Sequence, residues 1–123
     1  RKVFGPGDHA STFGGNPVSA AAACAVLDIL DDETIAQVRE KGEYLRNAIE
    51  SMDLPCLGKT RGMGLMIGVE VAEGFSNKEL CARLNQAGLL SLTAGPGLRF
   101  LPPLTITREE MDKGLAILKA TLS

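Results

Sequence analysis

Two hydroxyl residues and two glycines stand just before a predicted helix, in the stretch Ser11-Thr12-Phe13-Gly14-Gly15-Asn16-Pro17. Asn16 is a favourable N-cap, and Pro17 suits the first helical position, where a missing N–H leaves no intrahelical bond unmade. A turn that presents hydroxyls and backbone N–H groups beside a helix N-terminus attracts anions. The stretch is therefore a candidate phosphate site. The alternative is that Ser11 and Thr12 only bond backbone groups of the turn.

A second candidate is Arg99, within the segment Gly97-Leu98-Arg99-Phe100-Leu101-Pro102-Pro103-Leu104. On a strand with a period of two, Arg99 points away from the face shared by Leu98 and Phe100. A guanidinium held in this way binds a carboxylate through two parallel hydrogen bonds. The alternative is a solvated charge on an edge strand.

The lysines give no candidate nucleophile. A lysine that forms a covalent bond with a carbonyl cofactor works best in an apolar pocket that lowers its pKa. The lysines of this chain are expected on polar helix faces (Lys41, Lys78, Lys113 and Lys119) or in loops (Lys2 and Lys59).

His9, Gly62 and Gly64 are of residue types that occur in functional sites, but their surroundings in the sequence favour structural roles. His9 is the only histidine and lies in a glycine-rich loop without cysteine or carboxylate at ligand spacing, so we expect a structural or solvent-facing role and no metal site. Gly62 and Gly64 suit an anion cradle, but close backbone packing near a strand is the favoured interpretation.

Composition narrows the class of protein. With 123 residues the chain is one domain, small for a complete cofactor enzyme. A net charge of −2 without a basic face argues against nucleic acid as a partner, and no apolar run approaches the ~20 residues that span a bilayer. Three cysteines without a CxxC pair indicate free thiols in a reducing cytoplasm. Because the chain starts without methionine in an irregular segment, we expect part of a longer protein.

The pattern of apolar residues, caps and glycines predicts an α+β fold, in which helices pack on a small, mostly antiparallel sheet. Capping residues followed by Glu three positions later place the starts of two helices at Ser76 and Thr107. The expected elements are a loop at 1–16, helices at 17–30, 34–52 and 76–87, strands at 64–71, 89–93 and 98–101, and a final helix after 107.

Three segments closely resemble the C-terminal part of the class III (ornithine/acetylornithine-type) pyridoxal-phosphate aminotransferases, in the family's order and spacing. They are His9–Pro17, Arg61–Gly68, and Thr93–Pro96 leading into the Arg99 segment. The resemblance covers nearly the whole chain. It implies the small C-terminal domain of a fold-type-I enzyme, with an active-site loop at 1–16, a connecting helix at 17–32 and the α+β domain at 33–123.

The resemblance also implies residue roles. In this family the threonine at the position of Thr12 donates to the phosphate of the pyridoxal 5'-phosphate bound in the other subunit of a homodimer with shared active sites. The matching Ser11 would contact the amino-acid substrate, and Arg99 the substrate α-carboxylate. The cofactor-binding lysine and the aspartate for the pyridine nitrogen lie upstream in the family, so we expect no catalytic residue here and no activity from this chain alone.

The stretch Ala94-Gly95-Pro96 favours the acetylornithine members of the family, which exchange an amino group between N-acetylornithine and 2-oxoglutarate in arginine biosynthesis. The string Arg-Phe-Leu-Pro-Pro-Leu is shared with ornithine and 4-aminobutyrate aminotransferases. These and succinylornithine stay open as substrates. A non-catalytic module that binds a phosphate ligand is the alternative of a different class.

Overall fold

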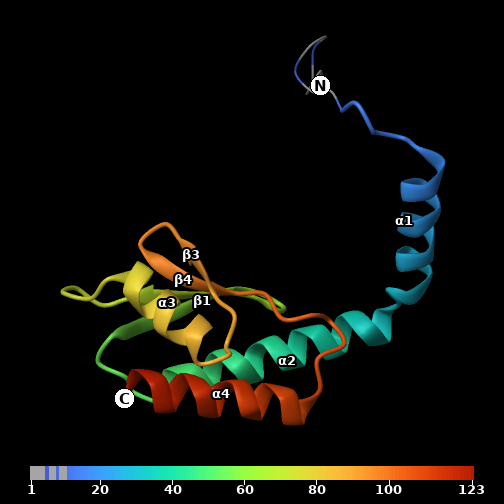
Figure 1. Cartoon of the computed structure of the whole chain (residues 1–123). Coiled ribbons are helices and arrows are strands. Elements are labelled where there is room, and N and C mark those ends of the chain that lie inside the picture. The colour runs from blue at the N-terminus through green and yellow to red at the C-terminus, as the bar shows by residue number, and fades with distance from the viewer. Residues whose placement is uncertain (1–4, 6–7, 9–10) are drawn as a thin grey trace. The chain divides into compact units, whose positions relative to one another are not determined.

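The structure, a computed structural model, describes Gly5, Asp8 and residues 11–123 (Figure 1). The position of His9 lies outside the described residues. The chain divides into two compact units, residues 1–32 and 33–123. The elements are α1 (Pro17–Ile29), α2 (Asp32–Glu50), β1 (Leu57–Met63), β2 (Met66–Val71), α3 (Asn77–Gln86), β3 (Leu92–Ala94), β4 (Gly97–Phe100) and α4 (Arg108–Leu122).

Helix α1 begins where the sequence predicts. The Asn16 side chain accepts a hydrogen bond from the backbone N–H of Ser19 at 2.9 Å, and Pro17 is the first helical residue. The helix ends at Ile29, one residue earlier than expected. Although the helix is rich in alanine and apolar residues, none of its residues is buried.

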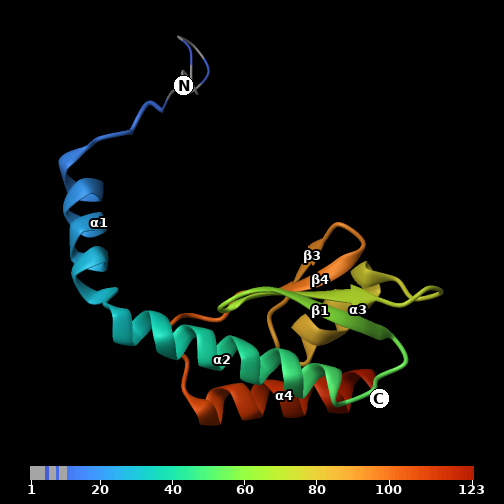
Figure 2. The ribbon, with the colours of Figure 1, turned by 180° about the vertical axis from the view of Figure 1, so that it is seen from behind.

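The second unit contains a four-stranded antiparallel sheet with strand order β1-β2-β4-β3 (Figure 2). The two central strands are aligned so that Ile67 lies opposite Phe100 and Val69 opposite Leu98. Because paired residues share a face, all four side chains lie on one side of the sheet, and all four are buried. The predicted α+β fold with a small antiparallel sheet is confirmed.

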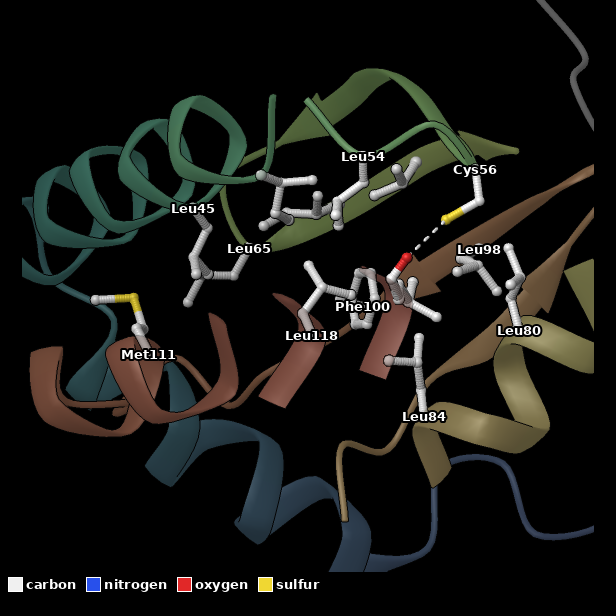
Figure 3. Close-up of a cluster of buried hydrophobic side chains, with 14 residues drawn as sticks. Leu45, Leu54, Cys56, Leu65, Leu80, Leu84, Leu98, Phe100, Met111 and Leu118 are labelled. Carbon is white, nitrogen blue, oxygen red and sulfur yellow. Dashed lines mark hydrogen bonds between the residues drawn. The ribbon is translucent and has the colours of Figure 1, made fainter. Parts of the chain in front are cut away.

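One hydrophobic cluster joins that face of the sheet to α2, α3 and α4 (Figure 3). Apolar residues of the helices supply part of it, although α2 is exposed at its start, where Ile35 is half exposed. The buried members are Leu45, Ile49, Leu54, Cys56, Leu65, Ile67, Val69, Leu80, Leu84, Leu98, Phe100, Met111, Leu118 and Leu122. The opposite face of the sheet, called the open face below, carries the exposed side chains of Met66, Glu70 and Arg99 within the second unit.

Strand β1 corrects the sequence prediction, which expects no element at 53–63 and starts the strand at Gly64. In the structure Gly64 and Leu65 form the two-residue loop of the β1–β2 hairpin, with Gly64 at φ +52°, and β2 starts at Met66. β1 lies at the edge of the sheet, and only two of its residues are even half-buried. It therefore lacks the apolar alternation that identifies a strand, and Lys59 lies in it rather than in a loop.

The observed helix termini agree with the sequence prediction better than strand β1 does. At α4, Thr107 and Glu110 form the reciprocal capping box. α3 ends in a Schellman motif, in which Leu89 N–H donates to the Leu84 carbonyl at 2.9 Å and Gly88, at φ +90°, to the Asn85 carbonyl at 3.2 Å. This motif uses Leu89 as part of the helix end, so β3 begins only at Leu92. In the part of the chain that the structure describes, no helix is long and apolar enough to cross a membrane.

Candidate functional site

The turn before α1 is held by Asn16 and by backbone bonds. The Phe13 carbonyl accepts from the backbone N–H of Asn16 at 3.4 Å and from its side-chain amide at 2.8 Å, and Gly14 N–H donates to the Ser11 carbonyl at 3.4 Å. The side chains of Ser11 and Thr12 are exposed. Neither hydroxyl is hydrogen-bonded to any residue that the structure describes. Their donors are therefore available to an anion, since they do not stabilise the described turn.

Arg99 lies on the open face of the sheet, as strand periodicity predicts. Its neighbours Leu98 and Phe100 are 1% and 9% exposed, whereas the Arg99 side chain is exposed. Among residues 11–123 no ion pair or hydrogen bond engages its guanidinium. Two buried side chains thus fix the strand, while the charged group between them is free to bind a carboxylate.

Gly68 lies beside Arg99 on the sheet and is covered by the side chain of Arg61. It is the paired residue on β2, while Leu92 is the paired residue on β3. A Cβ at Gly68 would lie 3.3 Å from Cγ of Arg61, which pairs with Gly68 from β1. Arg61, Gly68 and Arg99 therefore form one row across the open face, and the side chain of Arg61 lies over the glycine in the middle.

Arg61 is a second cation on this face that the sequence analysis does not single out. Its guanidinium lies 3.9 Å from the Glu70 carboxylate, and both side chains are more than half exposed. An ion pair this long and exposed contributes little to stability. The signal that locates Arg61 is the β1–β2 register, which depends on a strand that the apolar pattern does not reveal.

The glycines near the β1–β2 loop serve close packing, as favoured from the sequence. A Cβ at Gly62 would lie 1.9 Å from the Met66 carbonyl oxygen, and one at Gly42 of α2 would lie 2.0 Å from the Gly64 carbonyl oxygen. Arg46, one turn further along α2, donates to the same Gly64 carbonyl at 3.4 Å. The hairpin loop is therefore seated directly on α2.

Three groups with displaced pKa values lie in contacts between elements. The hydrogen bond that Tyr44 of α2 donates to Asp112 of α4 raises the pKa of the phenol, and Arg108 stacks on the same ring. Hydrogen bonds from Thr60 lower the pKa of Glu50. Burial raises the pKa of the Cys56 thiol, which lies 3.8 Å from the Leu122 carbonyl (Figure 3).

The lysines in the described part of the chain are exposed or half-buried, and none is in the core. Lys41, the least exposed of them, donates to the Leu104 carbonyl at 3.0 Å. The cysteines are free. The candidate residues therefore fall into two groups, Ser11 and Thr12 in the first unit and Arg99 in the second.

The family model and the individual relatives that match this chain point to the same class of protein. The family model for aminotransferase class-III matches residues 1–122. An ornithine aminotransferase of Bacillus subtilis is 43% identical over 122 residues, which are 98% of this chain and 30% of that protein. An acetylornithine aminotransferase of Haemophilus ducreyi is 45% identical over 122 residues, 99% of this chain and 30% of that protein.

Solved structures agree with these relatives. The crystal structure of acetylornithine aminotransferase from Elizabethkingia anophelis superposes with a TM-score of 0.79 at 33% sequence identity. The match covers 98% of this chain and 33% of that one. The chain thus spans about a third of the length of the proteins it matches.

Proposed function

Because this chain belongs to the class-III aminotransferases, we propose that it is the C-terminal part of an enzyme that transfers the amino group between N-acetylornithine and 2-oxoglutarate. The 45% identity with an acetylornithine aminotransferase and the fold of a second one support this proposal. The exchange would serve arginine biosynthesis in the cytoplasm. Since the chain spans about a third of its relatives, the rest of the enzyme would supply the remaining chemistry.

The observation that carries the proposal is the exposed, unpaired guanidinium of Arg99 between two buried neighbours. Its planar fork matches a carboxylate, so it would hold the α-carboxylate of the amino donor and then that of the 2-oxo acid. Because Gly68 has no side chain, none projects from β2 directly beside this guanidinium.

The family depends on pyridoxal phosphate, which when bound carries the amino group and withdraws electrons from the substrate Cα. The available donors fit one edge of its phosphate: the Thr12 hydroxyl would donate to a phosphate oxygen, and Ser11 would lie toward the substrate. In a homodimer with shared sites, Thr12 would serve the site of the other subunit.

The described lysines do not suit covalent attachment of the cofactor, because none of them is buried. We therefore place the cofactor-binding lysine in the rest of the enzyme. Residues 1–123 alone would then be inactive, with no catalytic residue of their own.

Ornithine is the second candidate donor, because relatives at 43% and 45% identity are named ornithine aminotransferases. The ratio of kcat/KM for N-acetylornithine to that for ornithine, measured on the intact enzyme, decides between the two. Our proposal requires that ratio to exceed one.

The Arg99→Lys variant tests the carboxylate role. Lysine keeps the charge but loses the planar fork, so kcat/KM for the amino donor and for 2-oxoglutarate should both fall by roughly two orders of magnitude. Arg61→Lys, on the same row of the open face, is the matched control and should change either value little. Unchanged kinetics in Arg99→Lys would refute the role.

A further inference from the structure

Asn77, the first residue of α3, reaches out of its helix to the β3–β4 hairpin. Its side-chain amide donates to the Gly95 carbonyl at 2.9 Å and to the Gly97 carbonyl at 3.2 Å. The two carbonyls stand on either side of Pro96, so one side chain bridges the tight turn. Arg99 follows only two residues after Gly97.

The strand that leaves this turn is held closely on its other side. Gly97 is buried, and a Cβ there would lie 2.4 Å from the Val69 carbonyl oxygen of β2. The backbone of β4 therefore touches β2 at its first residue. A shift of the turn would move the start of β4 against this contact, and with it the direction in which Arg99 leaves the sheet.

Strand pairing alone gives the hairpin modest support. β3 is an edge strand of three residues, Leu92–Ala94, and its first two residues are exposed. So short an exposed edge strand adds few ladder bonds and little buried area. A bond from outside the sheet therefore has a large share in fixing the turn.

We propose that Asn77 is a positioning residue for Arg99, because it fixes the β3–β4 turn from α3 and so sets the orientation of the carboxylate-binding guanidinium. This inference rests on the proposed function, because it takes Arg99 as the carboxylate-binding residue. It adds Asn77, a residue of α3 that makes no contact with substrate itself.

Two variants separate this role from a role in helix stability. Asn77→Asp has nearly the same shape, and an acid in the first turn favours the helix, but its oxygens face two carbonyl oxygens and cannot donate. Ser76→Ala is the matched control, because it removes the cap that accepts the Glu79 N–H and leaves both Asn77 donors in place.

The readout is the Kd of glutarate, a dicarboxylate without reactive groups, for the intact, cofactor-loaded enzyme. Asn77→Asp should raise this Kd about tenfold, because a displaced Arg99 guanidinium loses about one hydrogen bond to the carboxylate, and raise KM for the amino donor more than it lowers kcat. Asn77→Ser, whose shorter side chain loses the bonds but places no carboxylate against the two carbonyls, should give a smaller rise. Ser76→Ala should lower the melting temperature and leave the Kd unchanged.

Arg99→Ala provides the reference. If it leaves the Kd of glutarate unchanged, the carboxylate role of Arg99 is wrong and the proposed function loses its main support. If Arg99→Ala raises the Kd while Asn77→Asp and Asn77→Ser do not exceed Ser76→Ala, only the positioning role is overturned. Should the Asp variant fail to fold, the Ser variant decides.

Discussion

The turn that carries Ser11 and Thr12 and the strand that carries Arg99 differ in what holds them in place. The turn is fixed by hydrogen bonds between residues three or four apart, centred on Asn16. Arg99 stands between two core residues, on a central strand between β2, which lies about thirty residues earlier in the chain, and β3, which a tight turn joins to it.

This difference separates two kinds of candidate binding group. The geometry around Arg99 is a product of the fold of the second unit, since three helices and two neighbouring strands determine it. The geometry around Thr12 is purely local, and the helix after it exposes large apolar side chains such as Val18 and Leu27. In our proposal the substrate group is therefore ready once the domain folds, whereas the cofactor group acquires its function on assembly.

The largest effect that the comparison predicts is on stability. Leu118 of α4 is 1% exposed and Leu27 of α1 is 70% exposed. In the 123-residue chain, Leu118→Ala should lower the free energy of unfolding by about 2–5 kcal/mol, because it leaves a cavity in the core. Leu27→Ala should change it by less than about 0.5 kcal/mol. Urea denaturation measures both, and a costly Leu27→Ala would show that α1 is packed after all.

The next effect concerns the cofactor. In the intact enzyme, Thr12→Ala should weaken cofactor affinity by roughly ten- to a hundredfold, because a hydrogen bond to a charged group is worth about 1.5–3 kcal/mol. Thr12→Ser keeps the donor and should behave like the parent. Equilibrium dialysis of the cofactor gives the affinities, and thermal unfolding checks that the variants stay folded.

Mixed dimers test whether Thr12 serves the other subunit. A Thr12→Ala subunit is paired with a subunit that has lost the cofactor-binding lysine, so that the one lysine-bearing site takes its phosphate contact from an intact Thr12. That site should hold cofactor normally. Leakage as fast as in the Thr12→Ala homodimer would mean that Thr12 acts within its own subunit.

Replacing each of two helical glycines by alanine should change the stability of the fold by a smaller amount, with opposite signs at the two positions. Replacing glycine by alanine in a helix normally stabilises it by up to about 1 kcal/mol. Gly114→Ala should do so, because its Cβ would meet only Leu89 at an ordinary 3.5 Å. Gly42→Ala should instead destabilise the chain by about 1–3 kcal/mol, because the loop at Gly64 must move away. Denaturation midpoints of the two variants should therefore shift in opposite directions.

The smallest predicted effect is a pH dependence at Glu50. Thr60 donates to its carboxylate at 2.8 and 2.6 Å, and these bonds lower the pKa of Glu50 from 4.5. A lowered pKa stabilises the fold above the unfolded-state value, and this contribution is lost as pH falls through the folded-state value. The stability difference between the parent and Glu50→Gln should therefore shrink below about pH 4.5. A difference that stays constant to pH 3 would contradict the assignment.

Local signals in the sequence predict local structure well here. Asn16, Thr107 and Gly88 mark helix ends through bonds to residues three or four positions away, and the structure places all three at those ends. Alternating apolar residues predict strands at 64–71 and 98–101. The observed strands β2 (Met66–Val71) and β4 (Gly97–Phe100) lie within a few positions of these bounds. The outward direction of Arg99 follows from the same alternation.

Contacts between distant segments explain what was missed. β1 is a strand because β2 pairs with it, whereas its own residues are mostly polar or glycine. The row from Arg61 to Arg99 and the bond from Asn77 to Gly95 depend on register and on helix placement, which no single segment encodes. The roles of Ser11, Thr12 and Arg99 stay predictions.

The bridge from Tyr44 to Asp112 also makes the molecule easy to observe. The chain has one tyrosine and no tryptophan, so a single phenol provides its tyrosine absorption band. That phenol lies where α2 meets α4, stacked under Arg108 and bonded to a carboxylate. Because the bond raises the pKa of the phenol, ionisation at higher pH than free tyrosine reports that the two helices are in contact. An optical titration thus follows the docking of these helices without any added label.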